Sequence, residues 1–289
     1  MTEVVSHRRS ASAPGDESAG AVEAAYRAGR RRAAIRHRWR VHGLQVALVV
    51  AVGVIWEAAS GNVVPRITIS APSEILPQFG EWLVDGTLAS AALSTFGSAG
   101  LGILIGGCLG LLVGVLLGQS KNLAEVFEPF ITALYTMPKH ALVPLFIIWV
   151  GVGSALGVLM ASVVAFFLIF FNTFFGVRDV RPSLVNAVMI MGGSRTDVLR
   201  RVHAPSALIW VVAGLKLAVP QSIVGVVVAE MLAGDQGLGH LVSRNAGIFN
   251  TPGTFAALFA LLIAGFTVDR IMNWVTRKPL EWKNAASTA

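Results

Sequence analysis

The residues whose chemistry stands out are ionisable side chains inside long apolar runs. Lys139 and His140 follow Pro138 in one such run, and Lys216 and Glu230 lie in another. A charged side chain within a membrane is costly, so such groups are candidates for binding a charged solute on its way through. A proline inside a membrane helix also frees a backbone carbonyl group.

The sequence leaves two interpretations of the first group open. In one, Pro138, Lys139 and His140 line a pathway, and the two basic side chains help to stabilise an anionic ligand. In the other, the helix starts later and both basic residues lie at the cytoplasmic interface. Lys216 and Glu230 are about 21 Å apart along a helix, too far to pair. We expect Lys216 to extend toward the cytoplasm and Glu230 to meet an external loop or a partner subunit.

Motifs of known enzyme classes are missing from the sequence. It contains no His-Glu-x-x-His, no nucleophile elbow and no Gly-Lys dipeptide, hence no Walker phosphate loop. The one cysteine, Cys108, lies in an apolar run, which leaves no disulfide framework and no zinc-binding set. We therefore expect a chain without catalytic residues, a metal site or a bound cofactor of its own.

Composition indicates the class of fold that holds these residues in place. Of 289 residues, 54% are hydrophobic and 13% are charged, against about 25% charged in soluble domains. The mean hydropathy is +0.68. These values exclude an ordinary soluble enzyme and, for most of the chain, disorder. We predict an all-α membrane protein.

Six stretches approach the length of about 20 mainly apolar residues that a helix needs to cross a membrane. They are residues 41–60, 91–118, 129–150, 154–177, 207–231 and 254–275. We expect three regions: a basic, largely disordered tail (1–43), a six-span domain (44–276) and a short C-terminal tail (277–289).

The basic residues predict the orientation. If both termini are cytoplasmic, 19 Lys and Arg residues lie in the inner segments, and only Arg66 and Arg244 lie outside. Translocated loops are depleted in Lys and Arg, so we place both termini in the cytoplasm. Nine of the 23 basic residues precede residue 43, without an aromatic platform for nucleic acid. We interpret this tail as an anchor near the anionic headgroups of the lipid bilayer.

Glycines recur at every fourth position in the second span, at Gly102, Gly106, Gly110, Gly114 and Gly118. Such a strip lets another helix backbone approach closely. Packing within the chain is the favoured interpretation, and a subunit interface is the alternative.

The connection between the fourth and fifth spans, residues 178–206, has a helical pattern. Pro182 suits a helix start. The apolar positions that follow recur at helical spacing: Leu184, Val185, Val188 and Met191. Gly192 and Gly193 end that helix. An apolar ridge of this kind exposed to water usually has a partner.

A second short helix follows the two glycines. Ser194 and Asp197 have the spacing of a capping box. The helix carries Arg195 and ends before Pro205.

This loop resembles the hallmark cytoplasmic loop of the membrane-spanning permease subunits of bacterial ATP-binding-cassette (ABC) importers. That loop reads Glu-Ala-Ala, three residues, Gly, nine residues, Ile, any residue, Leu-Pro. The residues at its positions here, with the arginine that follows the glycine turn, are Asn186, Ala187, Val188, Gly192, Arg195, Val202, Ala204 and Pro205. Four of them depart from the motif, which leaves the position of the loop unchanged.

Other segments extend the resemblance to most of residues 44–280. Residues 137–151 are similar to the third span of permeases in the sulfonate, taurine and nitrate importer branch. So are residues 228–232 followed by Gly237-Leu238-Gly239, and the external start of a short amphipathic segment at residues 71–73.

The resemblance implies a type I ABC importer permease-like fold with cytoplasmic coupling helices, in a bacterial inner membrane. It implies a separate ATPase subunit that binds ATP and Mg and receives the loop, and an extracytoplasmic binding protein that delivers a small solute. It also implies two permease subunits around one pathway, as a homodimer or a pair of close relatives. The alternative is a six-span secondary transporter or channel not coupled to ATP, which predicts inverted repeats that the sequence does not show.

Overall fold

The computed structural model describes residues 16–180 and 182–286. These residues form helices joined by short connections, with an isolated β-bridge between Ser60 and Val64. The predicted all-α class is therefore confirmed. The chain divides into two units, Met1–Ala59 and Ser60–Ala289.

The described part of the first unit is one long helix, α1 (Asp16–Ala59). Its portion His37–Ala59 is long and apolar enough to cross a membrane. The helix begins within the tail that we expected to be largely disordered, because Ala and Arg, the commonest residues of this segment, are strong helix formers. Residues 1–15 lie outside the described residues, as do the side chains of 16–36.

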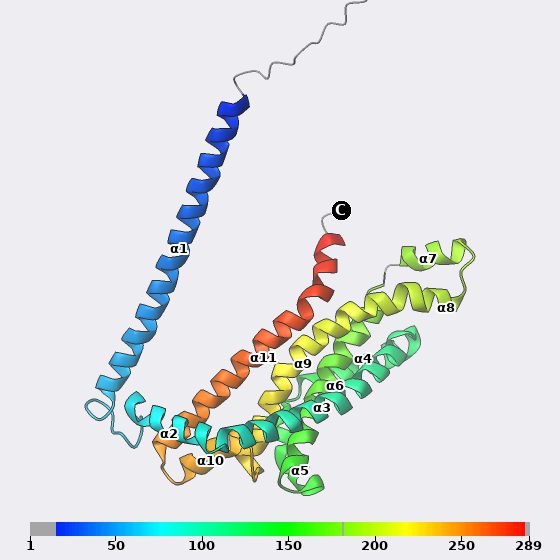
Figure 1. Cartoon of the computed structure of the whole chain (residues 1–289). Helices are drawn as coiled ribbons and strands as arrows, with labels where there is room; N and C mark the ends of the chain where they lie inside the picture. Colours follow the sequence, from blue (N-terminus) through cyan, green and yellow to red (C-terminus); the bar gives the residue numbers. More distant parts are fainter. Residues whose placement is uncertain (1–15, 181, 287–289) are drawn as a thin grey trace, which may run out of the picture. The chain divides into compact units, whose positions relative to one another are not determined.

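The second unit is a bundle in which helices alternate in direction (Figure 1). Its elements are α2 (Pro72–Val84), α3 (Thr87–Gly118), α4 (Lys121–Thr136), the 3₁₀-helix η1 (Lys139–Leu142), α5 (Val143–Val150), α6 (Ser154–Arg178), α7 (Pro182–Ile190), α8 (Arg195–Val198), the π-helix η2 (Leu199–His203), α9 (Ala204–Ala233), α10 (Leu238–Gly247) and α11 (Thr251–Ala286).

Among the described residues, five helices, α1 included, are long and apolar enough to span a membrane, or six if one bent pair counts as a single span. That pair is Asn122–Thr136 with Lys139–Val150, and its two parts meet at 82°. The number agrees with the six predicted spans. The unexpected feature is the break in the third, at Pro138, which has no N–H group to continue the helix.

Helices α3, α6 and α9 pack against one another and form the centre of the bundle. The glycine strip of α3 lies directly against α6. A Cβ on Gly106 would overlap the carbonyl oxygen of Ser162, and one on Gly110 would lie 2.6 Å from that of Phe166. The favoured interpretation, close packing within the chain, is confirmed.

One end of the bundle holds α2 and α10 (Figure 1). Helix α2 begins at Pro72, as the sequence predicted. In its first turn, Glu74 accepts hydrogen bonds from Ser70 Oγ at 2.7 Å and from Arg66 Nη1 at 2.6 Å. The Ser70 hydroxyl and the Arg66 charge hold the pKa of Glu74 below its ordinary value. The other end of the bundle holds α7 and α8.

Candidate functional site

The connection between α6 and α9 contains a helix, a glycine turn and the start of a second helix, as predicted. The second helix does not end before Pro205 as expected, because α8, η2 and α9 follow one another without a break and Pro205 lies in the first turn of α9, where a proline is tolerated. Helix α7 ends at Ile190, and Gly192 then adopts a left-handed conformation with φ of +81°. The Gly193 N–H donates to Val188 O at 2.9 Å, and a Cβ on Gly193 would lie 2.8 Å from that same oxygen. The turn therefore needs glycine at both positions, for conformation at the first and for space at the second.

The second helix starts with the predicted capping box. The Asp197 N–H donates to Ser194 Oγ at 3.2 Å, and the Ser194 N–H donates to the Asp197 carboxylate at 3.0 Å. The Ser194 hydroxyl also donates to that carboxylate, at 2.6 Å. These bonds from Ser194 lower the pKa of Asp197 below its ordinary value of 3.8, and the nearby Arg201 charge adds to the effect.

Replacing Ser194 by alanine is expected to loosen the start of α8, with roughly fivefold faster hydrogen exchange of its amides. The pKa of Asp197 is lower in the folded than in the unfolded chain. Its stabilisation is therefore fully present above the unfolded-state pKa and is lost as the pH falls through the folded-state pKa. The difference between parent and variant, measured by mass spectrometry and corrected for intrinsic rates, should be constant from about pH 5 to 8 and shrink below about 4.

Thr196→Ala changes an exposed neighbour outside the capping box and serves as the control. Equal exchange in parent and Ser194→Ala at neutral pH would show that the capping box does not hold this loop.

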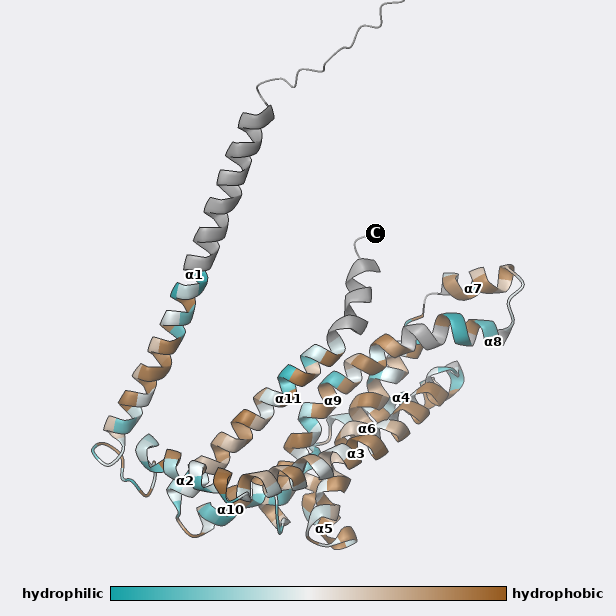
Figure 2. Cartoon of the chain, viewed as in Figure 1, coloured by the Kyte–Doolittle hydropathy of each residue, from teal (hydrophilic) through white to brown (hydrophobic). Residues whose placement is uncertain are grey.

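Helix α7 consists largely of apolar residues (Figure 2), and several of their side chains are exposed. The large side chains of α7 and its turn are exposed to the extent of 50% for Leu184, 49% for Met189, 86% for Ile190 and 78% for Met191. We call these four residues the α7 ridge. The predicted apolar stripe is thus divided, because Val185 and Val188 are half-buried while Leu184 and Met191 face outward.

Lys139 lies where the third span is broken. Its Nζ donates to the carbonyl oxygen of Tyr135 at 2.7 Å. It also lies 4.8 Å from the centre of the Tyr135 ring and 5.2 Å from that of Phe167. The ammonium group thereby satisfies a carbonyl at the C-terminal end of α4 and opposes the partial negative charge there. Pro138 and His140 are exposed.

The depth of Lys139 follows from its aromatic neighbour. Phe167 is about 20 Å from the start of α6 at Ser154 and about 17 Å from its end at Arg178, at 1.5 Å per residue. Contact with this ring brings the ammonium group near the middle of the span. None of the ion pairs described for residues 37–276 includes Lys139.

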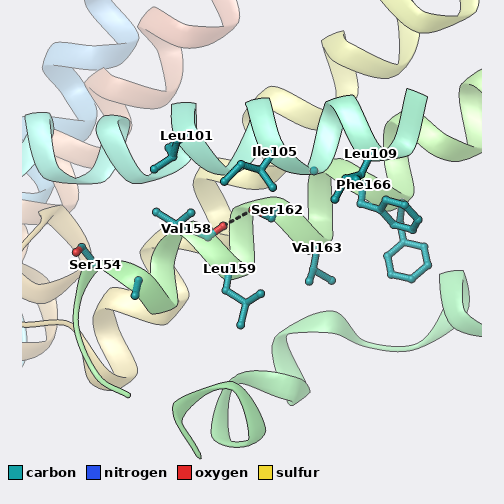
Figure 3. A pocket seen from close by; sticks show the side chains of 12 residues that line it. Leu101, Ile105, Leu109, Ser154, Val158, Leu159, Ser162, Val163 and Phe166 are labelled. Carbon is teal, nitrogen blue, oxygen red and sulfur yellow. Dashed lines mark hydrogen bonds between the residues drawn. The ribbon is translucent and has the colours of Figure 1, made fainter. Parts of the chain in front are cut away.

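A groove of about 660 Å³ runs between α3 and α6 (Figure 3). Its lining is apolar apart from two serine hydroxyls, and one of these, on Ser162, donates to Val158 O at 2.7 Å. Phe167 belongs to the lining and also contacts Lys139. One residue of the groove lining is therefore in contact with the cation.

Comparison with known proteins identifies the family. The model of the family described as binding-protein-dependent transport system inner membrane component matches residues 106–280. The chain belongs to this family.

Relatives of the permease cover almost its whole length. The riboflavin transport system permease protein RibX of Chloroflexus aurantiacus is 32% identical over 86% of this chain and 92% of its own. A protein of Bacillus subtilis described as an aliphatic sulfonates transport permease, SsuC, is 29% identical over 86% of this chain and 90% of its own. These matches agree with the resemblance to the sulfonate and nitrate branch.

A solved structure shows the same fold. The permease is similar to a chain of the inward-facing MetNI methionine ABC transporter, with a TM-score of 0.54 and 19% identity, over 69% of this chain and 97% of that chain. The permease thus has the type I ABC importer permease fold, which confirms the predicted fold class. It is a membrane transport subunit, and its family implies an ATPase and a binding protein as partners.

The motif positions of the permease have different environments. Asn186 and Ala187 are exposed on α7, Val188 is half-buried, and Gly192 makes the turn. Val202 is buried, with 7% of its surface exposed. The side chains of the other three predicted residues, Arg195, Ala204 and Pro205, lie outside the described residues.

Sequence reasoning missed two interactions of the permease. Arg178 Nη1 donates to Glu128 at 2.9 Å and joins the end of α6 to α4. Glu230 accepts from the N–H of Gly239, in the first turn of α10, at 2.9 Å. The missed part is Thr95 on α3, whose hydroxyl donates to the same carboxylate at 2.8 Å. No local signal joins residues 135 positions apart.

Proposed function

We propose that the permease is the membrane-spanning subunit of an ATP-driven importer and that the loop from α7 to η2 couples it to the ATPase. The observation that carries this proposal is the α7 ridge at one end of the bundle. Exposed apolar side chains on a projecting helix are the surface that an ATPase groove would bury. The position of the loop, directly before α9, would let an ATPase movement tilt that helix.

The proposed arrangement places both termini and the loop in the cytoplasm of a bacterial cell, with α2 and α10 on the other side of the inner membrane. The distribution of Lys and Arg supports it. The partner ATPase binds ATP and Mg, and a binding protein delivers the solute to the side of α2 and α10. Two copies of the permease enclose one pathway as a homodimer.

Pro138, Lys139 and His140 are the proposed pathway residues. The break at Pro138 supports this role, because it exposes backbone and a cation near the middle of a span. A cation there would favour a small anion, such as a sulfonate, taurine or nitrate. The related protein RibX is named for riboflavin, which is not a small anion, so the names of relatives do not point to one class of solute.

Replacing Lys139 by methionine tests the pathway role, because methionine keeps the chain length and removes the charge. Uptake of an anionic substrate is expected to fall about tenfold, since a lost charge-assisted interaction costs about 1.5 kcal/mol or more. Uptake by proteoliposomes containing the complete transporter measures this effect. The control is Lys216→Met, another intramembrane lysine. Unchanged affinity and rate in Lys139→Met would remove Lys139 from the pathway.

The importer assignment itself is tested by purifying the complex through the permease. The co-purifying binding protein is identified, its ligand is measured by calorimetry, and that ligand is used in uptake assays. Uptake should stop when ATP hydrolysis is blocked with vanadate. Uptake that continues on a proton or sodium gradient alone would instead indicate a secondary transporter.

A further inference from the structure

Glu230 is the most deeply buried acidic side chain among the residues whose exposure is described, with 6% of its surface exposed. It lies in the last turn of α9, inside an apolar span. Its partners come from two other helices, α3 and α10, and the proposed pathway does not use it. A buried carboxylate is tolerated only when its oxygens are hydrogen-bonded, so these partners define what Glu230 does.

Thr95 and Glu230 together cap the N-terminus of α10. The Gly239 N–H donates to Glu230 Oε2 at 2.9 Å, and the Leu238 N–H donates to Thr95 Oγ1 at 2.9 Å. The Thr95 hydroxyl in turn donates to Glu230 Oε1 at 2.8 Å. Two N–H groups of the first turn of α10, which have no partner within that helix, are satisfied in this way.

The two glycines of this turn make room for the carboxylate. Gly237 has a left-handed φ of +106°, and a Cβ there would overlap the Glu230 carboxyl group. A Cβ on Gly239 would overlap the carbonyl oxygen of Val227 on α9. The start of α10 is therefore held directly against the end of α9, and the glycines leave room for the Glu230 side chain between them.

Helix α9 joins this network to the coupling loop. It follows η2 without a break and continues for 30 residues, about 45 Å, to Ala233. Helix α10 lies beside this last turn of α9. Its apolar face packs against α3 and α11 through Leu238, Leu241 and Val242. A movement that starts at the loop therefore reaches α10 through the contacts of Glu230.

We propose that Glu230 and Thr95 are positioning residues that make α10 move with α9 during the transport cycle. The nucleotide state of the ATPase is thereby transmitted to the end of the permease that holds α2 and α10. This inference rests on the proposed function, because it needs an ATPase that moves the loop.

The test uses the complete transporter in nanodiscs, with spin labels on cysteines introduced into a Cys108→Ser background. One label pair, Ser183→Cys with Leu116→Cys, reports on α7. The other, Ala246→Cys with Leu116→Cys, reports on α10. All three positions are exposed. Labelled subunits are diluted with unlabelled ones, and distances are compared between the nucleotide-free and the vanadate-trapped complex.

In the parent, both distances are expected to change with nucleotide. Thr95→Val keeps the shape of the side chain but leaves the Leu238 N–H without its acceptor and removes the hydroxyl that donates to Glu230 Oε1. In this variant the α7 distance should still change, while the α10 change falls to half or less. Glu230→Ala should behave in the same way and provides a second variant if one of them folds poorly.

Two controls separate coupling from general destabilisation. Thr95→Ser keeps the hydroxyl and should restore the α10 change. Ser222→Ala removes a buried hydroxyl of α9 that donates to Ala161 O on α6, at 3.3 Å, and it should leave both changes intact.

If the α10 distance changes with nucleotide as much in Thr95→Val and Glu230→Ala as in the parent, Glu230 and Thr95 do not have the proposed positioning role. The proposed importer function would still stand. If the α7 distance of the parent does not respond to nucleotide, the proposed function fails, and this inference fails with it.

Discussion

Replacing Ile190 and Met191 together by aspartate is expected to weaken binding of the ATPase about 100-fold. These are the most exposed members of the α7 ridge, at 86% and 78%. Burying one such side chain contributes about 1.5 to 3 kcal/mol to the binding free energy. Losing about 1.5 kcal/mol at each of the two positions weakens the affinity roughly 100-fold. The charges that replace them would have to be desolvated in the ATPase groove, which adds to the loss.

The measurement is the affinity of the purified permease for its ATPase, with ATP hydrolysis by the complex as a second readout. The double substitution to serine separates loss of apolar surface from introduction of charge. Ala246→Asp places one negative charge on an exposed position of α10, outside the coupling loop, and should have little effect. An unchanged affinity in the aspartate variant would mean that the ATPase does not bury the α7 ridge.

Among glycine-to-alanine substitutions in the bundle, Gly106→Ala is expected to destabilise the fold most. The added Cβ would overlap the carbonyl oxygen of Ser162, a backbone atom of α6 that has no rotamer with which to move away. The two helices must separate, and overpacking of this kind costs about 3 kcal/mol. The thermal unfolding midpoint of the purified permease should fall by about 10 °C.

The same helix provides a matched control for this substitution. Gly100 has no atom within 4 Å of the position of a Cβ, so Gly100→Ala should leave the midpoint unchanged or raise it slightly. A midpoint for Gly106→Ala equal to that of Gly100→Ala would show that α3 and α6 are not in close backbone contact in the folded permease.

Features of the chain that depend on local patterns were predicted well. Composition predicted the helical membrane class, and apolar length predicted the spans. The spacing of Ser194 and Asp197 predicted a capping box that the structure contains. The four-residue period of the glycines predicted close packing, because a strip without side chains has no other way to bury its surface within a bundle.

Features that depend on distant contacts were not predicted. Thr95 is an ordinary helix residue by sequence, and only the fold brings its hydroxyl within 2.8 Å of Glu230. The two interpretations of Lys139 were equally compatible with an apolar run interrupted by proline. The contact of Lys139 with the Phe167 ring, midway along α6, depends on how α4 and α6 pack and has no signal in the sequence.

The sequence by itself determined which segments are helices in a membrane, where the loop between α6 and α9 turns, and to which family the chain belongs. These depend on composition, periodicity and the spacing of motifs along the chain. Tertiary structure alone decided which face of α7 stays exposed and which groups satisfy the buried carboxylate of Glu230. Burial and hydrogen bonding between separate helices depend on how those helices pack, and residue order along one helix does not contain that information.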